Sequence, residues 1–248
     1  EGARAGRMFW VLAVTAGVLA SSGLLLDNSA VIVGAMVIAP LYAPITGVAG
    51  GIILGRGRTA LRAAGVAMLA LTVALACGLA CGVLTPGVEV TEALAARGSV
   101  TFYSVAVALA AGTAAGYTVL RNDRVLVVGI VVAASLVPQS AAAGVFLGIR
   151  EWGLAAGAVL GLATNVVGIA LAIVAVCRWE HLRPERREQT PEQRRLVRRS
   201  AWGLGGAMAV LAGVTVWLSS VDFASVALTR RASAVREALA QVPGVLGT

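Results

Sequence analysis

Few side chains in this sequence of 248 residues could take part in chemistry, and they lie within long apolar runs. The polar side chains in the middle of these runs are Ser135, Gln139, Ser140, Thr164 and Asn165. Hydroxyl and amide groups inside a membrane need hydrogen-bond partners, which neighbouring helices supply by default. Contact with a polar solute is the alternative, and Gln139 and Asn165 are the best candidates for it.

Prolines interrupt two of the apolar runs near their middle. The first run has Pro40 and Pro44 on either side of Tyr42, and the second has Pro138. Proline removes a backbone donor and clashes with the preceding turn, which frees carbonyl groups. A kink in each helix is one interpretation. The other is a solute-binding site between two broken helices, whose exposed half-helix N-termini favour negative charge.

Polar residues also stand where apolar runs begin and end. Asp27, Asn28 and Ser29 separate the first two runs, and Asn122 occupies the equivalent place before a later one. Here a side chain can accept hydrogen bonds from the first free N–H groups of the next helix. We expect such caps, and gating or cation binding by Asp27 stays open.

No arrangement of residues typical of catalysis is visible in the sequence. The chain has three cysteines and one histidine. It lacks a nucleophilic triad, paired buried carboxylates, metal-ligand spacing and a phosphate-binding loop. Cys77 and Cys81 lie four residues apart in an apolar run, where a thiol usually packs. We therefore expect no enzyme, no cofactor and no bound metal.

The elements that must position these side chains are membrane helices. Of the residues 58% are hydrophobic and 13% charged, whereas a soluble domain carries about 25% charged residues. Seven apolar runs can be placed, at residues 8–26, 30–55, 60–84, 100–120, 125–149, 152–177 and 201–221. Each is long enough for a hydrocarbon core of about 30 Å. The composition excludes a soluble enzyme, a disordered chain and a disulfide scaffold, and predicts an all-α polytopic membrane protein.

Arginine positions predict the topology. With the N-terminus in the cytoplasm and seven crossings, fifteen of the arginines fall in inner segments and five in outer ones. That distribution follows the excess of cationic residues in cytoplasmic loops, so the net charge of +8 does not indicate a nucleic-acid partner. The inner arginines expected to contact anionic lipid headgroups are Arg194, Arg195, Arg198 and Arg199.

The sequence divides into segments on this basis. They are a cytoplasmic stub at 1–7, three helices at 8–84, an outer loop at 85–99, three helices at 100–177, an arginine-rich cytoplasmic loop and helix start at 178–200, a seventh helix at 201–221 and an amphipathic segment at 222–248. Glycine pairs at four-residue spacing, such as Gly78 with Gly82 and Gly144 with Gly148, predict close helix packing. A homo-oligomer is also expected from these faces and the seventh helix.

The two three-helix units resemble each other. Aligning residues 28–56 with residues 122–150 gives nine identities in 29 positions, among them Pro44 with Pro138. An odd number of crossings in each unit would place the second unit upside down, as in the inverted repeats of secondary transporters. The second helix (30–55) and the fifth (125–149) are then both expected to break at proline.

The stretch LLLDNSAVIVGAMVIAP, from Leu24 to Pro40, resembles the hallmark of a prokaryotic membrane family known as domain of unknown function 389, or the uncharacterised hydrophobic domain. The matching residues are Asn28, Ser29, Gly34, Met36, Pro40 and Pro44, and the resemblance covers most of residues 8–177. It implies a multi-pass protein of the prokaryotic inner membrane and brings no catalytic roles. Members often carry a small soluble domain before the membrane part, so we expect such a domain to be missing here.

Together these observations predict a transporter-like protein in the lipid bilayer. It would move a small polar or anionic solute through a site near the midplane, between the two broken helices. A second hypothesis is a non-transporting anchor or sensor for a cytoplasmic N-terminal domain, and a third is a channel.

Overall fold

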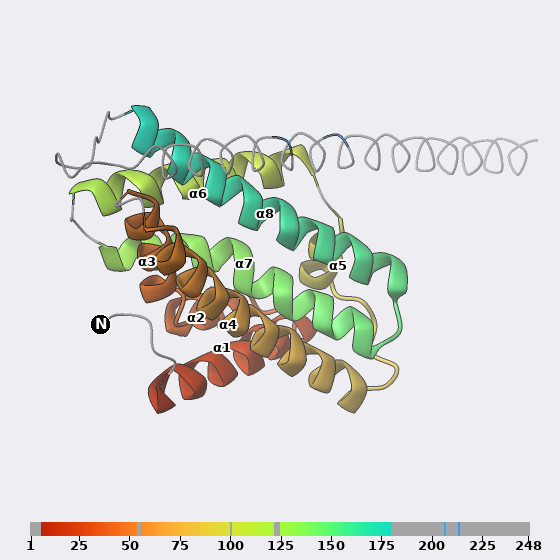
Figure 1. The fold of residues 1–248 in the computed structure, drawn as a ribbon. Coiled ribbons are helices and arrows are strands. Elements are labelled where there is room, and N and C mark those ends of the chain that lie inside the picture. The colour runs from red at the N-terminus through yellow and green to blue at the C-terminus, as the bar shows by residue number, and fades with distance from the viewer. Residues whose placement is uncertain are drawn as a thin grey trace, which may run out of the picture.

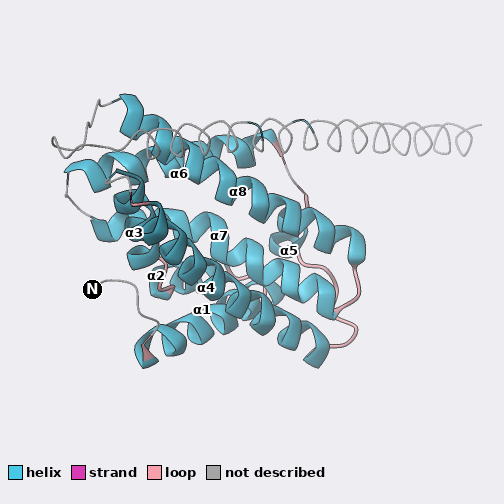
Figure 2. Cartoon of the chain, in the orientation of Figure 1, coloured by secondary structure: helices cyan, strands magenta, loops and turns pink. Residues whose placement is uncertain are grey.

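The computed structural model describes residues 6–53, 56–99, 101–121 and 125–179, together with Gly206 and Gly213. These ranges form helices α1 Arg7–Leu25, α2 Ser29–Ile38, α3 Tyr42–Ile53, α4 Gly57–Leu84, α5 Glu92–Gly98, α6 Phe102–Arg121, α7 Val125–Gly148 and α8 Trp152–Trp179 (Figure 1). No strand occurs in these ranges (Figure 2). The predictions for Asn122, for Arg194, Arg195, Arg198 and Arg199, and for residues 201–221 and 222–248 lie outside the described residues.

Successive passes of the chain run in opposite directions. The helices α1, α4 and α7 run one way through the bundle, while the α2–α3 segment, α6 and α8 run the other way (Figure 1). Each apolar run predicted between residues 8 and 177 corresponds to one helix, except the second run, which corresponds to the pair α2 and α3. The fold is an all-helical bundle, as the composition predicts.

Three of the described helices are long and apolar enough to cross a membrane: α1, α4 and α8. A fourth span results if α5 and α6, bent at 85° to each other, are counted as one. The outer surface of the bundle is apolar, and Trp152 and Trp179 are 67% and 80% exposed at the two ends of α8. They are ~40 Å apart at ~1.5 Å per residue, which matches a bilayer with its headgroup regions. This is a membrane protein.

The centre of the bundle is α7, which contacts all seven other described helices. Almost every side chain from Val132 to Phe146 is buried. The closest crossing is with α4, where Gly78 and Gly82 face Gly144 and Gly148. A Cβ atom on Gly144 would overlap the Leu75 carbonyl oxygen, and one on Gly78 the Ala141 carbonyl oxygen. The two glycine pairs predicted to allow close packing thus lie in the same interface, where Gly82 contacts Gly148.

The second segment breaks at Pro40, as predicted. Helix α2 ends at Ile38, and Ala39 has φ −58° and ψ 128°, the extended conformation that the residue before a proline prefers. The Leu41 N–H donates to the Ala39 carbonyl at 2.9 Å instead of continuing the helix. Pro44 lies in the first turn of α3, where a missing N–H costs little.

The prediction that the fifth segment also breaks is wrong. Helix α7 runs without interruption from Val125 to Gly148, with Pro138 inside it. The alignment paired Pro138 with Pro44, whereas the break arises at Pro40, whose counterpart is Ala134. Ala134 retains its N–H. A single proline is tolerated in a membrane helix when neighbouring groups satisfy the carbonyls that it frees.

We predict that Gly144→Ala destabilises the bundle because the added methyl group must push α4 away from α7. Overpacking of this kind costs about 1–3 kcal/mol of the free energy of unfolding. Gly65→Ala is the matched control, since a Cβ atom at Gly65 of α4 would meet nothing within 4 Å. Thermal unfolding in detergent, followed by tryptophan fluorescence, measures both. Equal midpoints for the two variants would contradict this packing.

Candidate functional site

A buried polar layer joins α7 to α8 near the middle of the bundle. The Asn165 side-chain Nδ2 donates to the Ser135 carbonyl at 2.8 Å. Pro138 leaves the Ala134 carbonyl without its helical N–H donor, and Ser135 is the next residue of that turn, so the Asn165 amide adds a donor beside the freed carbonyl. Asn165 is 7% exposed, and its Oδ1 accepts no hydrogen bond. It is the one buried side-chain polar atom without a partner in the part of the chain that the structure describes.

Gln139 and Ser140 tie α7 to three other helices. The Gln139 Nε2 donates to the carbonyl of Arg97 in α5 at 2.8 Å and to that of Ala158 in α8 at 3.3 Å. The Ser140 hydroxyl donates to the carbonyl of Leu71 in α4 at 2.6 Å. Both side chains are buried. Their donors therefore hold helices together in this structure.

The two remaining hydroxyls of the predicted site bond within their own helices. The Ser135 hydroxyl donates to the Val132 carbonyl at 2.9 Å, and the Thr164 hydroxyl to the Leu160 carbonyl at 2.9 Å. Such bonds back to the preceding turn are the usual solution for hydroxyl side chains inside membrane helices. Neither hydroxyl has a donor hydrogen left for a solute.

The interrupted segment is the other part of the predicted site. Pro40 is half-buried in the turn between α2 and α3, Tyr42 begins α3, and Pro44 is buried in its first turn. Both α2 and α3 contact α7, and α3 also contacts α8. The side-chain hydrogen bonds of Gln139 and Asn165 described above go to Arg97, Ala158 and Ser135 and not to this turn.

The break and the polar layer nevertheless lie at similar depths. Helices α2 and α8 begin at the same end of the bundle (Figure 1). The break follows the 10 residues of α2, ~15 Å from that end at ~1.5 Å per residue. Asn165 is ~20 Å along α8 by the same rise. Both therefore fall near the middle of a hydrocarbon core of about 30 Å.

At that end of the bundle, polar side chains between α1 and α2 cap two helices. Asn28 is the N-cap of α2, and its Oδ1 accepts from the N–H groups of Ala30 and Val31 at 3.0 and 3.2 Å. The sequence leaves open whether Asp27 or Asn28 caps this helix, and Asp27 does not. Its Oδ1 instead accepts from the Ala93 N–H at 2.9 Å, in the first turn of α5. Ser29 is the first residue of α2 and is exposed.

A left-handed backbone at Asp27, with φ 51°, turns its carboxylate away from α2. The Asn28 N–H donates to the Gly23 carbonyl at 2.8 Å and the Asp27 N–H to Leu24 at 3.4 Å, which is the Schellman arrangement that ends a helix. This turn carries the carboxylate of Asp27 to a helix more than sixty residues further along the chain.

Thr91 is a positioning residue that the sequence analysis missed. Its hydroxyl donates to the Leu24 carbonyl at 2.6 Å and accepts from the Leu94 N–H at 3.2 Å, which makes it the N-cap of α5. A threonine directly before Glu92 was the available signal, because this order is typical of a helix start. The predicted outer loop at 85–99 thus contains a helix held at its N-terminus by Asp27 and Thr91 and at its C-terminus by Gln139.

We predict that Asp27→Ala loosens α5 while leaving the bundle folded. Loss of a capping side chain costs about 1 kcal/mol, which corresponds to about fivefold faster amide exchange in α5. Glu89→Ala is the control, because Glu89 is an exposed acid in the same loop. Hydrogen–deuterium exchange of residues 91–98 distinguishes the variants. Equal uptake in both would show that the Asp27 carboxylate does not hold α5.

Comparisons with known proteins agree with the resemblance seen in the sequence. The model of the family described as domain of unknown function (DUF389) matches residues 36–171. An uncharacterized protein of Methanocaldococcus jannaschii is 22% identical over 185 residues, which cover 75% of this chain and 58% of that relative. The chain therefore corresponds to little more than half of that relative's length. No solved structure matches the chain. With the family model matched over more than half of its residues, this chain belongs to the domain of unknown function (DUF389) family.

Proposed function

We propose that this chain is the membrane part of a transporter-like protein, and that a small polar or anionic solute passes at the break between α2 and α3. The observation that carries this proposal is the interruption at Pro40, which lies near mid-depth and beside the central helix. The earlier hypothesis of two broken helices is replaced by one broken segment against one continuous helix.

The break leaves backbone groups in need of partners. In a continuous helix the carbonyls of Met36 and Val37 would accept from the N–H groups of residues 40 and 41. Pro40 has no N–H, and the Leu41 N–H bonds to Ala39 instead. Lipid offers no hydrogen bonds, so irregular backbone at this depth has to face protein or a hydrated space. Water or a polar solute is the partner that this proposal supplies.

Two features suggest what chemistry the solute carries. The N-terminal end of α3 begins directly after the break, and the dipole of a helix favours negative charge at that end. On α8 the unpaired Asn165 Oδ1 is a buried acceptor, which favours a ligand or water with a hydrogen to donate. A small anion that also bears a hydroxyl or amine group would satisfy both.

The helices of the bundle differ in how firmly they are held. Helix α7 is hydrogen-bonded to α4, α5 and α8 through buried side chains. The α2–α3 segment has a turn at its middle that can change its backbone angles. We propose that this segment moves against α7, since secondary transporters commonly move part of the bundle around a mid-depth site.

The proposal retains two expectations from the sequence, namely that the two three-helix units form an inverted repeat and that the N-terminus lies in the cytoplasm. Alternating passes make each three-helix unit run opposite to the other, which is what an inverted pair requires (Figure 1). Arg7, Arg56, Arg58 and Arg62 all belong to the end where α1 and α4 begin. The opposite end carries Asp27, Glu89, Glu92 and Glu151 beside two arginines. This asymmetry supports placing the arginine-rich end in the cytoplasm.

A second candidate function is a non-transporting anchor or sensor for a cytoplasmic domain. The observation that favours it is the use of the Ser135, Gln139 and Ser140 donors in bonds to backbone carbonyls. In that case the turn at Pro40 is a packed kink, and no water reaches it.

Cysteine accessibility separates the two functions without knowledge of the solute. The three native cysteines are replaced by alanine, and Ala39→Cys is compared with Ala133→Cys. These alanines align in the internal repeat, but Ala39 lies at the break and Ala133 is fully buried in unbroken α7. A negatively charged and a positively charged methanethiosulfonate, neither of which crosses membranes, are applied to proteoliposomes.

We predict that Ala39→Cys reacts at least about tenfold faster than Ala133→Cys, because burial and exclusion of water slow thiolate attack. The negatively charged reagent should react faster at Ala39→Cys than the positively charged one, because α3 begins there. Equal, negligible reaction at both positions would overturn the transport proposal and favour the anchor.

A further inference from the structure

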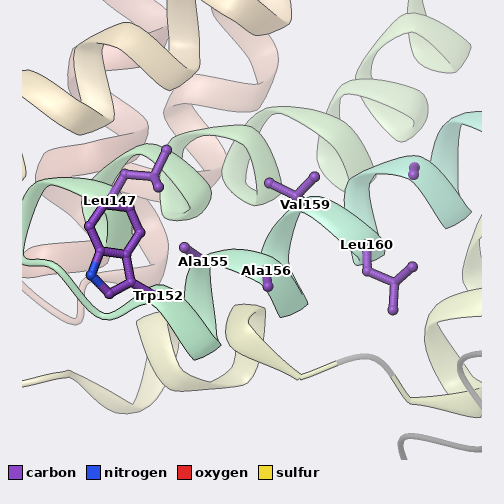
Figure 3. A pocket seen from close by; sticks show the side chains of 7 residues that line it. Leu147, Trp152, Ala155, Ala156, Val159 and Leu160 are labelled. Atoms are coloured by element: carbon purple, nitrogen blue, oxygen red, sulfur yellow. The ribbon is translucent and has the colours of Figure 1, made fainter.

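An apolar hollow of about 500 Å³ opens on the outer face of the bundle, between the end of α7 and the first half of α8. Its lining residues are Leu147, Trp152, Ala155, Ala156, Val159, Leu160 and Ala163 (Figure 3). Trp152 is 67% exposed and Val159 is 47% exposed, so the hollow faces outward and is separate from the buried polar layer.

The sequence of α8 explains the shape of the hollow. Positions 152, 156, 159 and 163 fall on one face of a helix because they are spaced by three or four residues. Ala156 and Ala163 have small side chains, and they alternate with the larger Trp152 and Val159. The result is a trough along the helix. It extends ~16 Å from Trp152 to Ala163 at ~1.5 Å per residue, about half of a ~30 Å hydrocarbon core.

The trough therefore has the length of one lipid leaflet, and its end at Trp152 lies at the membrane interface. Trp152 marks that interface, since tryptophan is enriched at headgroup level. A chain that occupies the trough would run from the headgroup region toward the midplane. Acyl chains have this direction and this apolar character.

Two exposed charges stand at the interfacial end. Arg150 and Glu151 lie between Leu147 and Trp152, which both line the hollow. Arg150 has φ 65°, and the Glu151 N–H donates to the Phe146 carbonyl at 2.9 Å, so a Schellman turn fixes the backbone here. Neither side chain makes an ion pair within the described residues. A guanidinium suits a phosphate, and a carboxylate suits an ammonium group.

We infer that this hollow binds one acyl chain of an amine-bearing zwitterionic phospholipid, with the phosphate at Arg150 and the ammonium group at Glu151. The adjacent carboxylate disfavours a purely anionic headgroup. The site is independent of the solute path, because it lies on the lipid-facing side of α8.

Tryptophan quenching by brominated lipids tests this inference. The protein keeps Trp152, and its four other tryptophans are replaced by phenylalanine. It is reconstituted in phosphatidylcholine vesicles that contain increasing fractions of phosphatidylethanolamine or phosphatidylglycerol with brominated acyl chains. Ala156→Phe fills the hollow, and Ala110→Phe on the exposed face of α6 is its matched control. Thermal unfolding verifies that each variant is folded.

Brominated phosphatidylethanolamine should quench Trp152 half-maximally at about one third of the mole fraction that phosphatidylglycerol requires, as expected for one partly exposed charge pair. Glu151→Gln should abolish this preference for phosphatidylethanolamine. Arg150→Gln should weaken the binding of both lipids, so that each quenches Trp152 half-maximally only at a higher mole fraction. In Ala156→Phe the quenching of Trp152 should depend only on the fraction of brominated lipid in the vesicle, whichever lipid carries the bromine. In Ala110→Phe the preference for phosphatidylethanolamine should remain. Quenching that follows the bulk ratio in every variant would overturn the site. Absence of quenching by either lipid would also overturn the lipid site, because it would mean that a second copy of the chain covers Trp152.

Discussion

A backbone carbonyl inside a bilayer needs a hydrogen-bond donor, and lipid supplies none. This constraint explains why two proline-containing segments of similar sequence have different structures. At Pro138 the helix continues, and the Asn165 amide of α8 donates to the Ser135 carbonyl, next to the Ala134 carbonyl that the proline frees. At Pro40 the Leu41 N–H turns back to the Ala39 carbonyl, and the helix ends. The same requirement accounts for the donors of Gln139 and Ser140, which reach carbonyls of other helices.

Close packing makes these short hydrogen bonds possible. The glycine pairs on α4 and α7 bring two backbones together, and Ser140 crosses that interface to the Leu71 carbonyl. Helix α5 fits against α8 at Gly157, where a Cβ atom would overlap the Gly98 carbonyl oxygen. Small residues therefore set the spacing, and polar side chains fix the register of the helices within it. Helix α7 acts as a continuous centre, and the α2–α3 segment is the discontinuous element beside it.

Local patterns in the sequence predicted much of this fold. Six apolar runs became helices, the second of them as a pair, Asn28 became a cap, and Pro40 became a break, because each depends on neighbours within a few residues. The glycine spacing predicted close packing, though not that α4 and α7 would be the pair. Contacts distant in sequence escaped prediction. Nothing near Pro138 shows that Asn165 will donate to the Ser135 carbonyl, and nothing near Asp27 shows that its carboxylate will reach α5.

The central claim is that the two proline-containing segments differ in exposure to water. Hydrogen–deuterium exchange of the full chain in nanodiscs, resolved for residues 38–43 and 134–140, tests it most directly. Our account predicts that the amides around Pro40 exchange at least about tenfold faster than those around Pro138, because only the first segment faces a hydrated space. Equal and strong protection of both segments would contradict the account and leave a closed bundle without a path for a solute.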